Sequence, residues 1–478
     1  MSQTLVLSLI ASFGLVMLTA NVIRRYSRGL DLFLVAERSV GTVVGAMGVA
    51  AAWIWAPSLF LAAQKSFQQG LPGIFWFTIP NVASLVLFAF VAQRIRHVFP
   101  RGYTLPEYVA SRFDGKTHVV YLFSFLSLQV CSLAVQLIAG AAMLQSLSGN
   151  PYPLGVAILA MVSVSYSLID GLQSSIRAHV LQLLIILAGI SVLVPAAVHD
   201  GGGLSVLETG LSGFQGRYGN LFDPEVAYSF GITVTIGLLA GPIGDQKFWQ
   251  RAFAFRPGTV FKGFLLGALL FAVVPVSMSF LGFLAAGNPL AAPEVYSGAV
   301  SPQQVGPEVV KTVLPGWGLI LFVLIVLSGL ASTGDSALCA GGSLIAVDVY
   351  RRYVNPGSSE ARMLRISRLA VSAIAVAAVG IAMIPGITIL SLFLFYGTLR
   401  SSTLMPTILM LYLQRVPAWG IFWGVALAMA FGLPAYIFGE LTNNIHVKVA
   451  ANIGIILISS IIPLLAFWIC GRRTNEMS

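Results

Sequence analysis

The chain has 478 residues, of which 57% are hydrophobic and only 9% are charged. Soluble globular proteins carry about 25% charged residues, so this chain cannot surround a folded body with a water-facing surface. The composition therefore excludes a soluble enzyme, a nucleic-acid-binding domain and a disordered scaffold, and it indicates a protein that lipid largely covers. The net charge of +10 is better explained by membrane topology than by a nucleic-acid partner.

Apolar segments follow one another along the whole chain. A hydrocarbon core of ~30 Å needs ~20 mostly apolar residues per helix, and this criterion gives about 13 spans. The sequence therefore predicts an all-α polytopic membrane protein with a single transmembrane domain over residues 1–478, and a short amphipathic helix from Leu105 to Phe113. The spans are predicted near residues 3–22, 40–63, 71–93, 118–146, 152–170, 176–198, 227–246, 260–286, 315–349, 364–386, 387–413, 417–439 and 448–470.

The charges of the connecting segments predict the orientation. Arg400 lies within the span 387–413, and most of the other basic residues, Lys247 and Arg251 among them, are assigned to inner loops. An excess of Lys and Arg on one side marks the cytoplasmic face, which puts the N-terminus outside and the C-terminus in the cytoplasm of a multi-pass plasma-membrane protein. The longest connections, about 199–226 and 287–314, are expected to be exposed outer loops. Four basic residues are assigned to the outer side: Lys65, Arg217, Lys311 and Lys448.

Two spans contain residues that interrupt a helix. Pro57 in the second span removes a backbone donor and clashes with the preceding turn, and the seventh span carries Gly241-Pro242-Ile243-Gly244 near its inner end. Unwound backbone occurs in lipid only where it lines a cavity or is buried in protein. Because matching interruptions are typical of an inverted-repeat transporter, we expect broken helices at both places. The alternative is that Pro57 merely kinks a packing helix.

The interruptions are five spans apart, which predicts two repeats of five helices, formed by helices 2–6 and 7–11. The predicted organisation is an extra N-terminal helix at 3–22, repeat 1 over 40–198, repeat 2 over 227–413 and two C-terminal helices within 417–470.

The ninth span carries an intramembrane carboxylate, Asp335, next to the hydroxyls of Ser332 and Thr333. A carboxylate in a span is a functional-site hypothesis by default, and hard cations prefer oxygen ligands. Hydroxyls with a few carbonyls would suit a monovalent cation. The alternative is close helix packing through small residues, with the hydroxyls bonded to the preceding turn.

Polar side chains at helical spacing in the fourth span are expected to point into the bundle. They form one face with i, i+3 and i+7 spacing, and contact with a solute or hydrogen bonding between helices would each account for them. The tryptophans beside Pro57 are compatible with stacking on a solute or with filling space. The solute-binding candidates are Trp53, Trp55, Ser58, Gln129, Ser132, Gln136 and Gln246.

With these motifs the chain resembles the sodium:solute symporter family over about residues 3–470. Ser332 to Ser336 followed by Asp348-Val349-Tyr350 is similar to the family's ninth-helix signature, Tyr166 to Gln182 resembles its fifth-to-sixth-helix motif, and Asp245-Gln246 with Gln250-Arg251 resembles the inner end of its broken seventh helix. The resemblance implies the inverted-repeat fold of the amino-acid transporter LeuT. A weaker similarity, in Trp53 to Ala56, Gly70 to Trp76 and Asp245 to Ala252, is to the urea-transporting branch.

The resemblance also implies a sodium site. In this family one sodium ion is held by two carbonyls of helix two and by a carbonyl and two hydroxyls of helix nine. Carried over to this sequence, the carbonyls are those of Ala51, Ile54 and Gly329, and the hydroxyls are those of Ser332 and Thr333.

Two positions depart from the family pattern. Many members have an acidic residue in the sixth helix where this sequence has His179, which makes a second sodium ion doubtful and proton coupling possible, because histidine titrates near neutral pH. The alternative is a structural histidine bonded to a backbone carbonyl. Gly241-Pro242 replaces the aromatic gate of sugar-transporting relatives, which disfavours a sugar. We assign coupling or gating to Asp335, His179 and Asp245.

The sequence thus predicts a secondary active transporter, not an enzyme, that couples sodium entry to the uptake of a small polar solute by alternating access. Urea is the first candidate solute, and Na⁺ is the coupling ion in place of any organic cofactor. A proton-coupled symporter, a carrier of an amino acid or carboxylate, a solute sensor and a channel are the alternatives. The expected partners are the solute, Na⁺ and the lipid bilayer, without nucleic acid, and the oligomeric state stays open.

Overall fold

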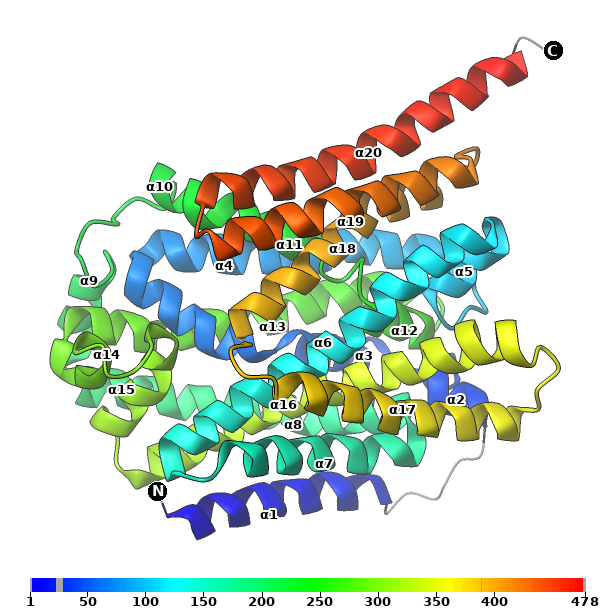
Figure 1. Cartoon of the computed structure of the whole chain (residues 1–478). Helices are drawn as coiled ribbons and strands as arrows, with labels where there is room; N and C mark the ends of the chain where they lie inside the picture. The colour runs from blue at the N-terminus through cyan, green and yellow to red at the C-terminus, as the bar shows by residue number, and fades with distance from the viewer. Residues whose placement is uncertain (1, 23–28, 388, 476–478) are drawn as a thin grey trace.

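A computed structural model describes residues 2–22, 29–387 and 389–475, and within them the side chains of all but residues 20–22, 390, 394 and 471–475. These residues form helices and no β-strand, with an isolated bridge between Val40 and Phe255 (Figure 1). The inner-side charges predicted at Arg24, Arg25 and Arg28 lie outside the described residues, as do the side chains of Arg472 and Arg473.

The N-terminal half follows the predicted spans closely. Its long helices are α1 (Gln3–Val22), α3 (Thr42–Trp53), α4 (Ala56–Val98), α6 (Gly115–Ser148), α7 (Tyr152–Asp170) and α8 (Leu172–Asp200). Between α4 and α6 lies the expected short helix, α5 (Leu105–Arg112). Its N-terminus is capped because the Thr104 side chain accepts a hydrogen bond from the Glu107 amide.

The C-terminal half contains the remaining long helices. They are α13 (Val260–Gly287), α16 (Gly316–Leu344), α17 (Glu360–Ala382), α18 (Ile389–Tyr412), α19 (Ala418–Leu441) and α20 (Ile445–Asn475). A π-helical stretch, η5 (Ile345–Val354), extends α16. The chain turns between α17 and α18 around Pro385-Gly386, as predicted.

The first break separates α3 from α4 at Ile54 and Trp55. Trp55 is extended, with φ −114° and ψ 174°, and Pro57 is the second residue of α4. Proline is tolerated there because the first amides of a helix need no intrahelical acceptor. Pro57 therefore begins the second half-helix and does not kink a continuous one. A further non-helical residue, Gly70 with φ 58°, divides α4 where the loop between the second and third spans was predicted.

The second break lies inside its helix and not near the inner end, which corrects the prediction of a span over 227–246. The first half is η2 (Ala227–Gly231) with α11 (Ile232–Leu239), and the second half is α12 (Gln246–Ala254). Lys247 and Arg251 belong to α12 and are 2% exposed. Their assignment to an inner loop is therefore wrong. Hydropathy predicts that a polar segment is exposed to solvent, and it takes no account of buried side chains that pair with the polar residues.

The two long connections are also more ordered than predicted. The segment 199–226 contains α9 (Gly203–Gly210), and 287–314 contains α14 (Pro293–Tyr296) and α15 (Val305–Val313). Within the described part of the chain, nine helices are long and apolar enough to cross a membrane by length and composition, and α1, α3 and the segment Pro224–Leu239 are shorter apolar helices. The count of about 13 spans, like the repeat boundaries, stays a prediction.

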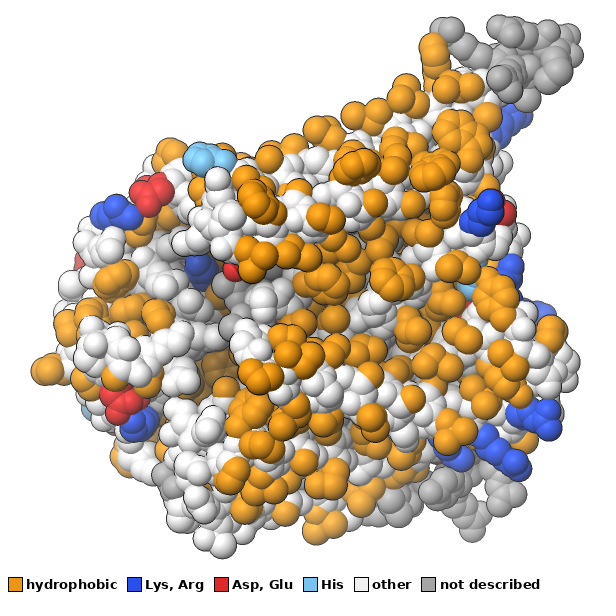
Figure 2. Space-filling view, in the orientation of Figure 1, with side chains coloured by type: hydrophobic (Ala, Val, Ile, Leu, Met, Phe, Trp, Pro, Cys, Tyr) orange, Lys and Arg blue, Asp and Glu red, His pale blue; other side chains and the backbone are white. Residues whose placement is uncertain are grey.

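The bundle has two distinct ends, which we call the α9 end and the α5 end. Figure 1 shows α9, α14 and α15 at the left and α2 (Leu30–Val35) and α5 at the right. The helix α1 starts at the α9 end and α20 finishes toward the α5 end, as an odd number of crossings requires. Apolar side chains cover the middle of the face in Figure 2, and its Lys and Arg side chains gather mainly toward the α5 end.

Candidate functional site

The predicted cation ligands meet where α16 crosses the first break. The Ser332 hydroxyl donates to the carbonyl oxygen of Ala51 at 2.8 Å and to that of Gly329 at 2.9 Å, and the Thr333 hydroxyl donates to the carbonyl oxygen of Ile54 at 3.1 Å. The Ile54 carbonyl is available because α3 ends there and the last carbonyls of a helix lack intrahelical donors, whereas the Ala51 carbonyl also accepts from the Ile54 amide at 3.2 Å. The five predicted oxygens thus form two buried hydrogen-bonded groups between α16 and the end of α3, and oxygen ligands are those that a hard cation prefers.

A polar network adjoins these oxygens one turn further along α16. Ser336 donates to the Ser332 carbonyl at 2.5 Å, and Asp335 Oδ1 lies 2.8 Å from His179 Nε2. The His179 Nδ1 atom lies 3.3 Å from the Gly48 carbonyl of α3 and 3.2 Å from a guanidinium nitrogen of Arg251. The coupling candidates Asp335 and His179 are therefore in direct contact, and both are completely buried.

The third coupling candidate, Asp245, lies at the second break. Its Oδ1 caps α12 by accepting from the Lys247 amide, and its Oδ2 forms ion pairs with Lys247 Nζ at 3.2 Å and Arg400 Nη2 at 3.1 Å. All three side chains are at most 2% exposed. A buried charge needs such partners because its desolvation is costly.

Aromatic rings join the two breaks. Trp53 and Trp55 stack with ring centroids 5.6 Å apart, and the Arg400 guanidinium lies 5.7 Å, 5.6 Å and 4.5 Å from the ring centroids of Trp53, Trp55 and Tyr396. This is the geometry of cation–π contacts. The close approach requires glycine at the second break, because a Cβ on Gly241 would lie 2.4 Å from the Trp53 ring.

The polar stripe of the fourth span, on α6, faces both breaks. The Gln129 amide donates to Asp245 Oδ1 at 3.2 Å, the Ser132 hydroxyl accepts from Lys247 Nζ at 2.9 Å, and Gln136 Oε1 accepts from the Ala56 amide at 2.9 Å. All three side chains are buried. In this conformation they connect the two broken helices.

Two other solute-binding candidates occupy different surroundings. Ser58, in the first turn of α4, is buried, and its Oγ has no hydrogen-bond partner among the described residues. Gln246 does not join the cluster: its amide bonds to the Leu105 amide and the Tyr103 carbonyl, which fastens α12 to α5.

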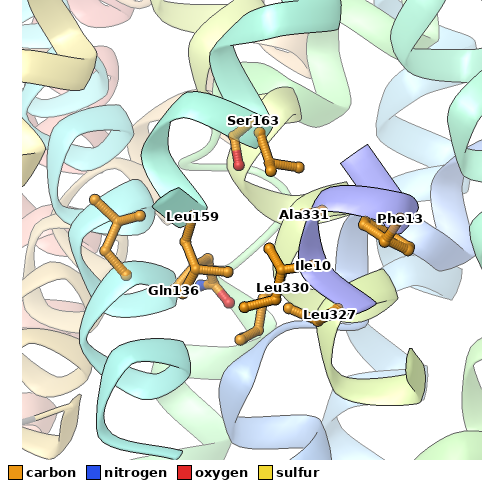
Figure 3. Close-up of a pocket in the computed structure, with 10 residues that line it drawn as sticks. Ile10, Phe13, Gln136, Leu159, Ser163, Leu327, Leu330 and Ala331 are labelled. Carbon is orange, nitrogen blue, oxygen red and sulfur yellow. The ribbon is translucent and has the colours of Figure 1, made fainter. Parts of the chain in front are cut away.

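Two cavities lie near these residues. A small one of about 10 Å³ lies between α1, α6, α7 and α16, and Figure 3 shows Gln136 and Ser163 among apolar side chains that include Ile10 and Leu330. It has room for about one water molecule and not for a solute. A larger cavity of about 420 Å³ lies at the α9 end, where Figure 2 shows the surface hollowed. Its lining includes Pro57 and Phe393.

Three basic residues of the site were not among the predicted candidates, namely Lys247, Arg251 and Arg400. The signal for Arg400 was present in the sequence, since a charge in the middle of a span marks a functional position. Lys247 and Arg251 could not be recognised because the second half-helix is too polar and too short to register as a span.

Two broken helices whose ends meet buried polar groups, in an all-helical membrane protein, define the class of secondary transporters. The model of the sodium:solute symporter family matches residues 33–428, so the chain belongs to that family, as its ninth-helix signature predicted. Members of this family are transporters and not enzymes, which also confirms the predicted class.

The chain is similar to curated relatives with different solutes. It is 28% identical over 448 residues to the urea-proton symporter DUR3 of Oryza sativa subsp. japonica, covering 85% of this chain and 60% of the relative. It is 26% identical over 441 residues to the sodium/pantothenate symporter of Escherichia coli strain K12, covering 87% of this chain and 86% of the relative. The chain therefore spans only part of the length of the rice protein.

Solved structures support the fold. A Na⁺-coupled sialic acid symporter in a substrate-bound outward-open state superposes with a TM-score of 0.78 at 15% identity, covering 96% of this chain and 98% of the other. A nucleobase-cation-symport-1 family transporter has a TM-score of 0.59 at 16% identity, with 93% and 96% of the two chains covered. These structural similarities confirm the predicted LeuT-like, all-helical fold.

Proposed function

We propose that this symporter uses an inward sodium gradient to take up a small polar solute by alternating access. The observation that carries the proposal is the convergence of the Ser332 and Thr333 hydroxyls on the carbonyls that the first break exposes. Sodium bound there joins α16 to α3 and stabilises one arrangement of the two helices. Its loss to the cytoplasm releases them, and the gradient sets the direction of transport.

The solute is proposed to bind beside the same break, against Trp53 and Trp55 and near the stripe on α6. Urea is the first candidate because relatives are named as urea transporters, among them the rice protein and the urea active transporter of Saccharomyces cerevisiae. A planar solute suits the face of an aromatic ring.

The contact between His179 and Asp335 supports proton coupling as a second candidate. The two side chains are 2.8 Å apart and buried at the edge of the proposed sodium site. A buried histidine beside a carboxylate is a usual site for a transferable proton. The name of the rice relative includes a proton, whereas that of the Escherichia coli relative includes sodium.

The orientation is part of the proposal. With the N-terminus outside the plasma membrane, the α9 end and its cavity face outward and the α5 end faces the cytoplasm. The gathering of Lys and Arg side chains toward the α5 end in Figure 2 supports this orientation.

Uptake into proteoliposomes tests the proposal. The full chain is reconstituted, and radiolabelled urea uptake is measured with and without an inward sodium gradient at two pH values. Ser332→Ala and Thr333→Ala are each expected to weaken the apparent sodium affinity by about tenfold, because each removes one oxygen ligand, and tenfold corresponds to about 1.4 kcal/mol.

A matched control lies on the same helix. Ser343 is buried in α16 and donates only to the Ala340 carbonyl one turn earlier, so Ser343→Ala should keep wild-type sodium affinity. Unchanged sodium affinity in both ligand variants would contradict the proposed site. Accumulation driven by a proton gradient without sodium would favour the second candidate instead.

A further inference from the structure

We propose that the solute of this symporter is a small carboxylate, held by Arg400 and Lys247 at the second break. The inference rests on the proposed symport and gives it a substrate class. It begins from the charges around the breaks, where Lys247, Arg251 and Arg400 face only two carboxylates, Asp245 and Asp335. The buried site therefore carries an excess of positive charge.

No other buried carboxylate of the described residues balances this excess. Asp170 is paired with Arg177, Asp348 with His118, and Glu308 with Lys311, each away from the breaks. Arginine stays protonated in proteins, and a buried charge without a counter-ion is costly. A sodium ion at Ser332 and Thr333 would add one more positive charge. An anionic solute supplies the missing negative charge.

The unpartnered polar atoms near the breaks point to the same class of solute. Buried N–H groups without a hydrogen-bond partner among the described residues belong to Trp53, Trp55 and Arg400, and the hydroxyls of Ser58 and Tyr396 also lack one. All five can donate, and the unpartnered acceptors on the helices of the two breaks and on their neighbours include Gln129 Oε1, Gln250 Oε1 and Asp335 Oδ2. A carboxylate offers about four acceptor positions and no donor, so it suits the five donors.

Arginine is suited to a carboxylate because its planar donors match the two oxygens. The Arg400 guanidinium is held by one ion pair to Asp245 and by three aromatic rings, and its Nε remains unpartnered. Lys247 lies on the other side of the same Asp245 oxygen. Arg400 and Lys247 therefore both pair with Asp245 in this structure. They would pair with a second carboxylate, that of the solute, when it binds.

The cavity at the α9 end has the same charge balance. The charged residues of its lining are Lys65, Glu440 and Lys448, and the last two are paired at 2.7 Å. Lys65 forms no ion pair among the described residues and lies 4.4 Å from the centre of the Phe230 ring. Phe393, which lines the cavity, has its ring centroid 5.0 Å from that of Trp55. The unpaired Lys65 therefore gives the cavity a positive charge, as Lys247, Arg251 and Arg400 do for the site at the breaks.

The test is sodium-dependent binding to the purified full chain, measured by tryptophan fluorescence and thermal shift in sodium sulfate or potassium sulfate. The probes are pairs that differ only in charge, acetate with acetamide, propionate with propionamide and benzoate with benzamide, together with urea and chloride. We expect at least one carboxylate to bind with sodium and its amide to bind at least about tenfold more weakly, since the amide cannot compensate the excess charge.

Variants of the charged residues give changes in opposite directions. Arg400→Gln and Lys247→Met should weaken carboxylate binding by about tenfold or more. Asp245→Asn removes the competing carboxylate, keeps a residue type that caps a helix, and should strengthen carboxylate binding, which no folding defect would do. Lys116 and Arg362 are exposed, so Lys116→Met and Arg362→Gln serve as controls.

The outcomes separate this inference from the proposed function. Sodium-dependent binding of urea or an amide without its carboxylate would overturn the inference and leave the symporter standing. Equal binding of chloride, or no binding of any carboxylate although sodium stabilises the wild type and not Ser332→Ala, would also overturn it. Carboxylate binding that ignores sodium would keep the solute class and reject sodium coupling.

Discussion

The two carboxylate oxygens of Asp335 have different surroundings. Its Oδ1 accepts from Ser175, lies 2.8 Å from His179 Nε2 and lies 3.2 Å from the Ser336 hydroxyl, while Oδ2 has no hydrogen-bond partner among the described residues. The charged or titratable groups that face His179 are Asp335 and Arg251. An unsatisfied carboxylate oxygen in a buried network is costly, and it is a natural acceptor for a proton or an ion that arrives during the transport cycle.

Replacement of the histidine tests whether a proton is involved. His179→Gln keeps a side chain that can donate to Asp335 but cannot take up a proton. We expect the variant to lose any pH dependence of uptake that the histidine causes, while it keeps sodium-driven uptake. Initial uptake rates in proteoliposomes measure this, and exposed His199 provides the control His199→Gln. A wild-type pH profile in His179→Gln would leave the residue with a positioning role.

The broken helices show what a sequence can predict at the level of elements. Pro57 and Gly241-Pro242 located both breaks, because few residues other than proline and glycine interrupt a helix in lipid. The halves beyond the breaks were harder to predict. Hydropathy identifies helices that lipid surrounds, whereas α12 is buried in protein, where its Lys247 and Arg251 side chains bond to Asp245, Ser132 and Ser336. Those contacts come from distant parts of the chain, and no local pattern reveals them.

The same distinction applies to the site. The pairing of Ser332 and Thr333 with the α3 carbonyls was implied by the family resemblance, whose most specific signature lies on a single helix. The Arg400 contact with Asp245 joins positions 155 residues apart, and composition gives no sign of which span lies opposite another. The prediction for Gln246 failed for the same reason. Its position beside the break suggested contact with a solute, but its side chain bonds to the backbone of Tyr103 and Leu105 at the start of α5.

The helix α5 and the residues before it connect η5, α12 and α2. Asp348 in η5 accepts from Thr104 at 2.7 Å, and Arg351 in η5 pairs with Glu107 at 2.6 Å. Burial raises the pKa of Glu107 above its usual value despite the lowering effects of the Tyr103 amide and Arg351. Tyr103, whose pKa burial raises to about 12, keeps its proton and donates to Asp31 of α2. These contacts close the α5 end in this structure.

The direction of the Glu107 shift predicts a pH effect on this closure. A carboxyl whose pKa is raised where it is buried favours its protonated form there, so lowering the pH toward that pKa favours the closed α5 end, and raising the pH favours opening. Glu107→Gln should remove this dependence and stay closed at both about pH 5 and about pH 8. Spin-label distances between Ser111 and Arg352 measure the closure. Equal pH responses in variant and wild type would contradict a role for Glu107.

At the scale of the whole molecule, the structure is hollow at one end and closed at the other. The cavity of about 420 Å³ lies at the α9 end, while the α5 end is closed by hydrogen bonds such as that from Arg112 to the Leu413 carbonyl at 2.7 Å. Phe393 and Trp55 lie between the cavity and Arg400. In this structure the cavity therefore lies on the α9 side of the first break, with Pro57 in its lining.

The charge of this entrance gives the last prediction. Lys65 stands in the cavity without an ion pair among the described residues, and a positive charge in a concave, low-dielectric entrance raises the local concentration of an anion. Lys65→Gln should therefore slow carboxylate entry at low salt by about threefold to tenfold and leave the equilibrium affinity at the breaks nearly unchanged. The difference from wild type should shrink as salt rises, because screening shortens the range of the charge.

Lys448 lines the same cavity but is paired with Glu440. The variant Lys448→Gln therefore controls for the change in side-chain shape that a Lys-to-Gln substitution makes in the cavity. Stopped-flow tryptophan fluorescence at several salt concentrations measures the entry rate, and a Lys65→Gln rate that matches wild type at low salt would show that the entrance does not steer anions.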